Sequence, residues 1–333
     1  MTRAIIARAP TRLDFAGGWT DVPPYCDREG GLVCNIAITR YATATAASGG
    51  HVAGPRSSPA SATAADDALV RAAVARSTLS SADAQLASDF PLGAGLGGSS
   101  AAGVALAGAL RELAGSPLDP ASLAALSRAT EVDELGLPGG SQDHYAAAIG
   151  GALLLTFSDC VGVERIDLSA RCRAAIARRG VVLYTGESRI SGDTILAVLD
   201  GYLAGDPRVV GALARTKALA VQVAAALRTE DLDALGVLIG ENWVEQRRLH
   251  PSITTPRIDA IVDTAARHGA LGTKALGASG GGCVLAFAAD GREDELADAL
   301  ASLGTRLEYE IDTAGFDVIA RLTGDDMHHE EQR

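Results

Sequence analysis

A glycine-rich segment carries the clearest chemical signal in this chain of 333 residues. Residues 91–101 read PLGAGLGGSSA, and a stretch rich in alanine, leucine and valine follows at once. Glycines let successive backbone N–H groups turn toward one concavity, and the start of the predicted helix adds unpaired donors and the positive end of a dipole. The segment therefore predicts an anion site built from backbone. Its members are Gly93, Gly95, Leu96, Gly97, Gly98, Ser99 and Ser100.

The two serines at the end of this loop add side-chain chemistry. Ser99 and Ser100 can cap the helix and offer a hydroxyl to a magnesium ion held by phosphates. No lysine follows the last glycines, so the segment is not a Walker A loop. The alternative is an ordinary glycine-rich turn with serine caps, which a lone Gly-x-Gly would favour. Eleven consecutive residues of this kind favour the anion site instead.

Three segments, in this order along the chain, resemble the GHMP kinases, the superfamily of galactokinase, homoserine kinase, mevalonate kinase and phosphomevalonate kinase. Residues 9–21 (APTRLDFAGGWTD) resemble their N-terminal substrate motif, residues 91–101 their phosphate-binding motif, and residues 272–283 (GTKALGASGGGC) their C-terminal glycine motif. The resemblance implies transfer of the γ-phosphoryl group of ATP, with Mg²⁺, to a small molecule. It also implies an α+β fold of two domains, with the active site between them. The first, residues 1–175, would be similar to ribosomal protein S5, and the second, residues 176–333, ferredoxin-like.

The resemblance assigns catalytic roles to two residues. Asp143, within GGSQDHY at 139–145, matches the family's catalytic aspartate, which would accept the proton of the sugar hydroxyl. Otherwise it is a helix-start acid favoured by the dipole. Arg12 matches a basic residue beside the nucleophile in several members, where a fixed cation would make the hydroxyl more acidic and favour the ionised aspartate. The alternative for Arg12 is a surface arginine.

Metal and sugar contacts follow from the same resemblance. Glu131 falls close to the glutamate that binds Mg²⁺ in mevalonate-type members, although the turn between it and Asp143 is about one residue longer here, and Ser99 is the expected serine ligand. Asp21 matches an acid that binds sugar hydroxyls, and a carboxylate, which only accepts, suits a polyol better than a phosphate. Trp19 either stacks on a sugar ring or fills the core of its loop. The other expected substrate contacts are Asp14, Gly18, Thr20, Gln142, Arg189, Gly280 and Gly281.

Within the superfamily, the sequence is similar to the branch of fucokinases and heptose 7-phosphate kinases. Members of that branch phosphorylate the anomeric hydroxyl of a sugar and so prepare it for nucleotidyl transfer. The length fits a stand-alone heptose 7-phosphate kinase better than the larger bifunctional fucokinases. The first hypothesis is therefore conversion of D-glycero-D-manno-heptose 7-phosphate to its 1,7-bisphosphate. The matching stretches are 17–25 (GGWTDVPPY), 30–38 (GGLVCNIAI), 142–147 (QDHYAA) and 184–191 (YTGESRIS).

One departure from that branch concerns the distal phosphate. Ser141 stands where the bacterial heptose kinases usually carry lysine. Arg189, Arg247 and Arg248 are candidate replacements, because arginine binds phosphate bidentately, but solvated surface charges are an equal alternative. Two other functions stay open: a 1-kinase for an unphosphorylated sugar such as L-fucose, and a catalytically silent relative that senses a sugar.

Strands and helices are expected to position these residues, and in the second half of the chain the helices come in runs and the strands pair antiparallel. Strands at 4–8 and 31–46 flank a loop at 16–24, and residues 47–64 form a surface loop. An arginine-rich stretch at 169–180 marks the domain boundary. Helices are expected at 66–79, 101–114, 119–135, 142–149, 193–204, 207–228, 231–249, 256–268 and 292–303, and further strands at 151–157, 181–185, 282–288 and 306–322.

Composition excludes several classes of protein. The chain has 29 basic and 41 acidic side chains, a formal net charge of −12, and 47% hydrophobic residues, which argues against a broad nucleic-acid or anionic-membrane surface and against disorder. The five cysteines form no Cys-x-x-Cys pair and indicate reduced thiols. Without a signal-peptide pattern or an apolar stretch near the roughly 20 residues of a membrane span, we expect a cytoplasmic protein. Its expected partners are ATP and a sugar or sugar phosphate, with a homodimer as candidate assembly.

Overall fold

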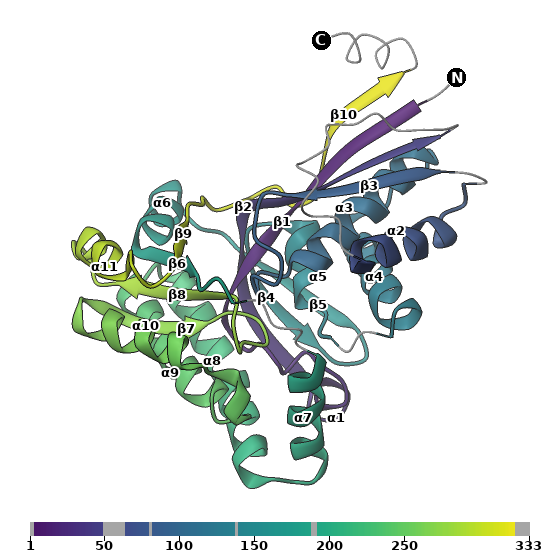
Figure 1. The fold of residues 1–333 in the computed structure, drawn as a ribbon. Coiled ribbons are helices and arrows are strands. Elements are labelled where there is room, and N and C mark those ends of the chain that lie inside the picture. Colours follow the sequence, from purple (N-terminus) through teal and green to yellow (C-terminus); the bar gives the residue numbers. More distant parts are fainter. Residues whose placement is uncertain (1–2, 49–63, 80–81, 137–138, 188–191, 324–333) are drawn as a thin grey trace.

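Two antiparallel sheets organise the chain in the computed structural model, which describes residues 3–48, 64–79, 82–136, 139–187 and 192–323 (Figure 1). The larger sheet has the order β10-β1-β2-β4-β5, with β3 also paired to β2, and the smaller has the order β7-β8-β6-β9. The strands of the larger sheet are β1 (Arg3–Ala16), β2 (Gly31–Ser48), β3 (Asp83–Ser88), β4 (Ala152–Phe157), β5 (Val161–Ile166) and β10 (Asp317–Thr323). Those of the smaller are β6 (Gly180–Tyr184), β7 (Ala270–Ala275), β8 (Cys283–Ala288) and β9 (Thr305–Leu307).

The first motif lies largely inside a strand. β1 and β2 pair along almost their whole length, and the register shifts between Pro10 and Thr11 and again between Asp14 and Ala16. Such irregularities bend a strand and re-aim its side chains. The connection from β1 to β2 contains the short helix α1 (Tyr25–Glu29).

Helices rich in small residues cover the larger sheet. α3 packs on β1 and β2, and its alanines and glycines let it approach them closely, which suits a chain with only 4% aromatic residues. The phosphate loop enters α3, and α5 carries Asp143 in its first turn. The helices of this half are α2 (Ala64–Arg76), α3 (Gly98–Leu113), α4 (Pro120–Ala129), the π-helical turn η1 (Thr130–Glu134) and α5 (Gln142–Ile149).

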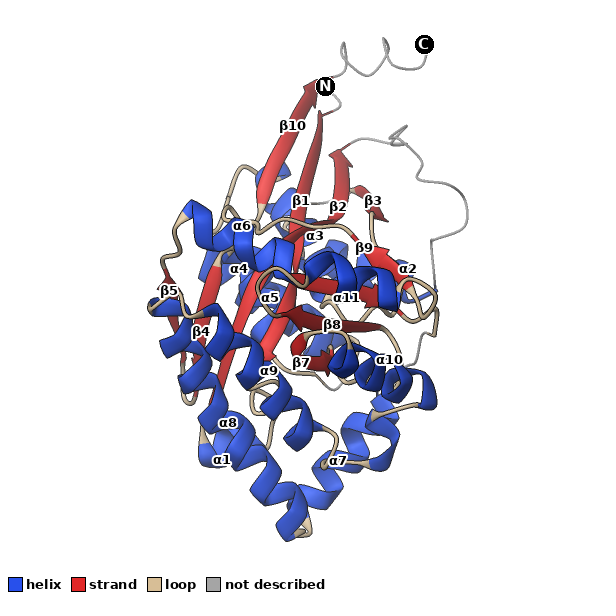
Figure 2. Cartoon of the chain, turned by 90° about the vertical axis from the view of Figure 1, so that its left-hand side faces the viewer, coloured by secondary structure: helices blue, strands red, loops and turns tan. Residues whose placement is uncertain are grey.

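The helices of the second half surround the smaller sheet, as Figure 2 shows from the side. α9 packs on β7, and α8 packs on both α9 and β2, so it bridges the two sheets. α8 has the length and apolar character of a membrane span, yet half of that apolar window is buried in the core. The helices are α6 (Ala170–Arg179), α7 (Gly192–Leu203), α8 (Pro207–Arg228), α9 (Leu232–Gln246), the 3-10 turn η2 (Pro251–Ile253), α10 (Pro256–Arg267) and α11 (Glu293–Leu300).

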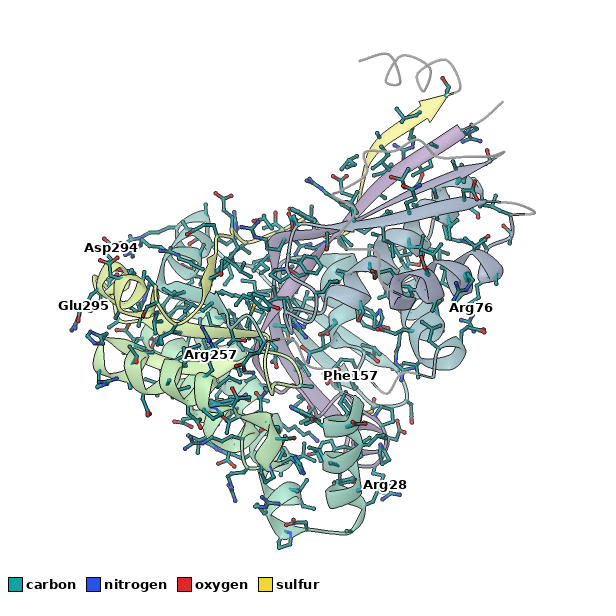
Figure 3. The ribbon with its side chains drawn as sticks, in the orientation of Figure 1. Arg28, Arg76, Phe157, Arg257, Asp294 and Glu295 are labelled. Atoms are coloured by element: carbon teal, nitrogen blue, oxygen red, sulfur yellow. The ribbon has the colours of Figure 1, made fainter. Side chains whose placement is uncertain are left out.

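Charged side chains cover the outer surface of both halves. Arg28, Arg76, Arg257 and Glu295 are exposed, and Figure 3 shows Glu295 at the outer edge of the second half. Many of these charges are paired locally, such as Arg76 with Glu134 at 2.9 Å.

The α+β fold class is confirmed, but several elements differ from the sequence expectations. β3, β5 and β7 were not expected, and the arginine-rich stretch taken as a boundary contains α6. The strand expected at 306–322 is two strands, and the second, β10, pairs with β1 in the larger sheet. Short edge strands depend on their partners more than on local pattern, which explains why they were missed. The division at residues 175 and 176 stays a prediction, and residues 49–63 of the expected loop lie outside the described residues.

Candidate active site

The phosphate loop joins β3 to α3 through left-handed glycines. Gly93, Gly95 and Gly97 have φ of 68°, 72° and 75°, a region that only glycine adopts readily. The helix begins earlier than expected, with Gly97 as N-cap, so the two serines lie in its first turn and do not cap it. Because no side chain caps this helix, its first N–H groups remain available to an anion.

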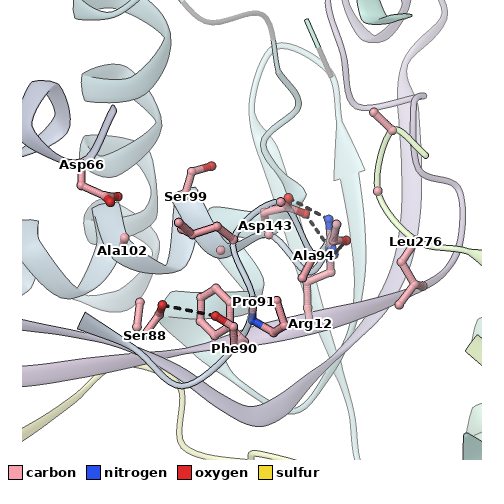
Figure 4. Close-up of a pocket in the computed structure, with 18 of the residues that line it drawn as sticks. Arg12, Asp66, Ser88, Phe90, Pro91, Ala94, Ser99, Ala102, Asp143 and Leu276 are labelled. Atoms are coloured by element: carbon pink, nitrogen blue, oxygen red, sulfur yellow. Dashed lines mark hydrogen bonds and ion pairs between the residues drawn. The ribbon is translucent and has the colours of Figure 1, made fainter. Parts of the chain in front are cut away.

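A cavity of about 330 Å³ opens beside this loop (Figure 4). Five of the seven predicted phosphate-binding residues line it, whereas Leu96 and Ser100 are buried and do not. Leu96 instead accepts a hydrogen bond from the backbone N–H of Arg12 at 3.1 Å, which fixes the first motif to the loop. The five lining residues are Gly93, Gly95, Gly97, Gly98 and Ser99.

Arg12 and Asp143 meet at the edge of the cavity, as the dashed lines of Figure 4 mark. The Nε and Nη2 atoms of Arg12 donate to the two carboxylate oxygens of Asp143 at 2.6 and 2.8 Å, and Nη1 donates to the carbonyl of Gly95 at 2.8 Å. Arg12 is 3% exposed, while the side chain of Asp143 is 23% exposed. A bidentate pair of this kind fixes the carboxylate firmly and leaves it reachable from the cavity.

The expected metal ligands also come together. Glu131, in η1, accepts a hydrogen bond from the hydroxyl of Ser100 at 3.2 Å and lies 3.0 Å from Nε2 of His144. Burial alone would raise the pKa of Glu131, but hydrogen bonds from His144, Ser99 and Ser100 and the charge of His144 outweigh it and lower the pKa to about 2. Glu131 is therefore an ionised carboxylate next to Ser99, at the start of the helix that follows the phosphate loop.

The first motif contributes a buried polar cluster on the other side of Asp143. Asp21 accepts a hydrogen bond from the backbone N–H of Gln142 at 3.0 Å, and Gln142 accepts one from Asn35 at 3.3 Å. The ammonium group of Lys274, which is fully buried, donates to Asp14 at 3.0 Å. The cluster consists of Asp14, Asp21, Asn35, Gln142 and Lys274.

Charge in this cluster is costly. Burial raises the pKa of Asp21 to about 6, and the charges of Asp143 and Asp14 add to the rise, although the N–H of Gln142 opposes it. Burial likewise lowers the pKa of Lys274, and the pairing with Asp14 opposes that change. Among the described residues, two atoms of this cluster are buried without a hydrogen-bond partner, Asp14 Oδ1 and Asn35 Oδ1, and so is Nε1 of Trp19 in the first motif.

Other residues expected at the sugar site lie elsewhere or form hydrogen bonds to the backbone. The hydroxyl of Thr20 donates to the carbonyl of Gly17 at 2.7 Å and of Leu32 at 3.0 Å, so it braces the loop. Gly18 lies against Asp14, since a Cβ there would be 2.2 Å from its Oδ2. Trp19 is 7% exposed and does not line the cavity.

The third motif forms the wall facing the phosphate loop. Gly281 lines the cavity, whereas the N–H of Gly280 donates to the carbonyl of Ile253 at 2.8 Å and holds the motif against η2. Of the candidate distal-phosphate arginines, Arg189 lies outside the described residues. Arg247 and Arg248 are exposed at the end of α9 and do not line the cavity, and Arg248 pairs with Glu245 at 2.5 Å.

Sequence reasoning assigned no role to Asn35 or to Lys274. The signal for Asn35 was present, because it is the one strongly polar residue in the apolar run 31–38 of β2. Lys274 is one of only two lysines in the chain, and it stands near the start of the third motif, ahead of its run of glycines. A charged or amide group inside a buried strand requires a polar partner, which points to a site.

Comparisons with known proteins show the family and the fold of this chain. Residues 63–151 match the family described as "GHMP kinases N terminal domain" and residues 223–305 match "GHMP kinases C terminal". The chain is 27% identical over 318 residues to the D-glycero-alpha-D-manno-heptose 7-phosphate kinase of Campylobacter jejuni, covering 90% of this chain and 93% of that protein. It is 32% identical over 260 residues to the galactokinase of Mycobacterium tuberculosis, covering 70% and 69%.

A solved structure shares the whole fold. The crystal structure of a D-glycero-D-manno-heptose 1-phosphate kinase from Bacteroides thetaiotaomicron superposes with a TM-score of 0.73 at 24% identity, covering 97% of this chain and 99% of that one. The fold thus has a counterpart in a known structure, and the two family models include the phosphate loop and the third motif within the residues that they match. The chain belongs to the GHMP kinases and is an ATP-dependent sugar kinase of that family.

Proposed function

We propose that this kinase phosphorylates the anomeric hydroxyl of a sugar, with D-glycero-D-manno-heptose 7-phosphate as first candidate and its 1,7-bisphosphate as product. The product would feed the synthesis of nucleotide-activated sugars. The observation that carries the proposal is the Arg12–Asp143 pair, fixed at the edge of the cavity that the phosphate loop lines. The likeness to the heptose 7-phosphate kinase of C. jejuni over 90% of the chain supports this substrate.

The residues that line the cavity suit a bound nucleotide. The phosphates would lie on the N–H groups of the glycine loop, where backbone donors and the start of α3 favour an anion. The lining also includes the apolar side chains of Leu86, Phe90 and Leu92, which can receive a base. About 330 Å³ also falls within the usual range of small-molecule sites, roughly 300–1,000 Å³.

The residues present fit a magnesium ion. Ser99 and Glu131 offer a hydroxyl and an ionised carboxylate, the oxygen donors that this cation prefers. No group of three His, Cys, Asp or Glu side chains that could hold a metal occurs among the described residues. Magnesium characteristically takes one or two protein ligands and completes its shell with phosphate oxygens and water. When bound, it would neutralise charge on the transferred phosphoryl group.

Proton transfer and positioning fall to the protein. Asp143 would accept the proton of the attacking hydroxyl, since its carboxylate faces the cavity and is held by two hydrogen bonds. Arg12 would hold that carboxylate still and offset the negative charge of the reacting groups. Phosphoryl transfer needs mainly such positioning and charge stabilisation, and an anomeric hydroxyl is more acidic than other sugar hydroxyls.

The polar cluster of the first motif would bind the sugar. In this cluster Asp14 and Asn35 each carry an unpartnered acceptor, which matches a sugar hydroxyl as donor; outside it, Trp19 of the first motif carries an unpartnered donor. Asp21 contacts Gln142, the residue before Asp143, so a sugar bound there would lie near the proton acceptor. Thr20 and Gly18 would shape the loop around it. A cytoplasmic location and a homodimeric assembly stay predictions from the sequence.

A substrate panel tests the proposal. ATP would be offered with heptose 7-phosphate, L-fucose, D-galactose and D-mannose, with ADP release measured and the products examined by ³¹P NMR. We expect the fastest turnover with heptose 7-phosphate and a new phosphate signal coupled to the anomeric proton. Turnover of a free hexose but not of heptose 7-phosphate would overturn the substrate. Sugar binding without ADP release from any of them would favour the sensing alternative.

A further inference from the structure

A buried histidine beside the catalytic aspartate joins the helices around the phosphate loop. His144 is 0% exposed. Its Nδ1 lies 3.0 Å from the hydroxyl of Ser127, and its Nε2 lies 3.0 Å from Glu131 and 3.2 Å from Ser100. We propose that His144 is a positioning residue that orients the Glu131 carboxylate toward a divalent cation bound to the nucleotide phosphates. This inference rests on the magnesium site of the proposed function.

The direction of the hydrogen bonds follows from the chemistry of the partners. A carboxylate only accepts, so the Nε2–H of His144 donates to Glu131. A hydroxyl can donate or accept, so Ser127 can serve Nδ1 whether the ring is neutral or protonated. The donor facing Glu131 is thus present in either form of the ring, and the arrangement does not depend on titration of His144.

The helices around this histidine pack closely against one another. A Cβ at Gly103, in α3, would lie 2.5 Å from the hydroxyl of Ser127, so glycine is required there for α4 to approach. Glu131 lies in the π-helical turn that follows α4, a distortion often found at functional sites. Ser100 gives Glu131 a second donor from the first turn of α3. Four consecutive elements, α3, α4, η1 and α5, therefore fix the position of the Glu131 carboxylate.

This geometry resembles the way proteins orient metal ligands in general. Partners hydrogen-bonded to a ligand fix its orientation, and their loss typically weakens metal affinity roughly 10- to 100-fold. His144 also directly follows Asp143, so the orientation of Glu131 is tied to the helix that carries the proton acceptor. The competing interpretation is that His144 only fills the core.

Two substitutions separate these interpretations because each amide replaces one ring nitrogen. His144→Gln places an amide nitrogen near Nε2 and keeps a donor to Glu131. His144→Asn places it near Nδ1 and keeps only the contact to Ser127. The probe is Mn²⁺, titrated by electron paramagnetic resonance into enzyme saturated with a non-hydrolysable ATP analogue, without sugar. His268→Asn is a control, because His268 faces Glu295 on the surface at 3.5 Å.

We expect Mn²⁺ affinity to fall roughly tenfold or more in His144→Asn, as in Glu131→Gln, and to stay within about threefold of the native value in His144→Gln and His268→Asn. Affinity for the metal-free nucleotide should not change. Ser127→Ala, which does not change Glu131 itself, should weaken Mn²⁺ binding by a smaller factor. This variant replaces His144→Asn in the test if His144→Asn does not fold.

Three results would overturn the inference. Native Mn²⁺ affinity in folded His144→Asn, or in Ser127→Ala if that variant replaces it, removes the positioning role. Equal weakening in His144→Asn and His144→Gln, with equal loss of melting temperature, shows a packing role only. Native affinity in Glu131→Gln shows that the cation lies elsewhere. None of these results depends on which sugar is phosphorylated, so they are separate from the substrate panel.

Discussion

Single residues of the first motif hold charge where burial makes it costly. Asp21 is 2% exposed, and its pKa is raised to about 6 by burial, with the charges of Asp143 and Asp14 adding to the rise. Its side chain still accepts the N–H of Gln142 at the start of α5. Stability alone would favour an uncharged residue in this position, and retention of a carboxylate agrees with a role in binding sugar hydroxyls.

Replacement of Asp21 by asparagine should therefore stabilise the protein in a pH-dependent way. The ordinary pKa of 3.8 is raised in the folded state, so the folded protein favours the neutral acid. The ionised Asp21 carboxylate lowers the free energy of unfolding. This loss of stability is absent below pH 3.8 and complete above about pH 6. At roughly 1.4 kcal/mol per pKa unit, it is on the order of 3 kcal/mol.

Thermal denaturation of Asp21→Asn and the native protein between pH 4 and pH 8 checks this prediction. We expect the variant to melt at a higher temperature at pH 8, and the difference to vanish toward pH 4. The KM for the sugar should also be higher in Asp21→Asn than in the native protein. A melting difference that is constant across this range would show that ionisation of Asp21 is not the cause.

At the scale of elements, the start of α3 and the start of α5 are placed against each other. Gly97 is the N-cap of α3, and a Cβ on it would lie 2.9 Å from the carboxylate carbon of Asp143. The loop that would hold the phosphates and the residue that would accept the proton therefore share one contact. Any side chain at position 97 must displace one of them.

The variant Gly97→Ala should lose turnover beyond its loss of stability. Alanine at a left-handed φ costs ~1–2 kcal/mol, and displacement of a reacting group by about 1 Å costs on the order of 100-fold in rate. Gly115→Ala is the matched control, since Gly115 ends the same helix with φ 69° and nothing lies within 4 Å of its Cβ position. Melting temperatures should fall in both variants, since both carry the cost of the left-handed φ, whereas steady-state kinetics should show a fall in kcat for Gly97→Ala alone. Equal kcat in the two variants would contradict this account.

At the scale of the whole molecule, buried contacts tie the two sheets together. The Lys274–Asp14 ion pair joins β7 of the smaller sheet to β1 of the larger, and both side chains are almost fully buried. β10 returns from the end of the chain to pair with β1. The strand that carries Arg12 is thus held from both halves.

Removal of one partner of this ion pair should be worse than removal of both. Lys274→Met leaves the Asp14 carboxylate buried without its cation, which typically costs roughly 3–5 kcal/mol. The double variant Asp14→Asn/Lys274→Met removes both charges and should recover most of that loss. Chemical denaturation of the single and double variants measures the difference. A double variant no more stable than Lys274→Met would show that the pair does not hold the sheets together electrostatically.

The sequence predicts those parts of the site that lie where a regular element begins or ends. The glycine loop precedes α3 and Asp143 lies in the first turn of α5, so local pattern was enough to place both, while the catalytic role of Asp143 came from the family resemblance. The Arg12–Asp143 pair came from a family resemblance, since 131 residues separate the partners. Lys274 with Asp14, and β10 with β1, depend on pairings across more than 250 residues, which no local pattern encodes.

On the proposed function, Asp143, held by Arg12, would serve phosphoryl transfer and not nucleotide binding. The most direct measurement compares single-turnover phosphoryl transfer and ATP affinity in the native protein and in Asp143→Asn, with heptose 7-phosphate as acceptor. The account predicts a rate reduced by roughly 10²–10⁴-fold, the usual contribution of a general base, with ATP affinity changed by less than about threefold. A native transfer rate in Asp143→Asn would contradict it.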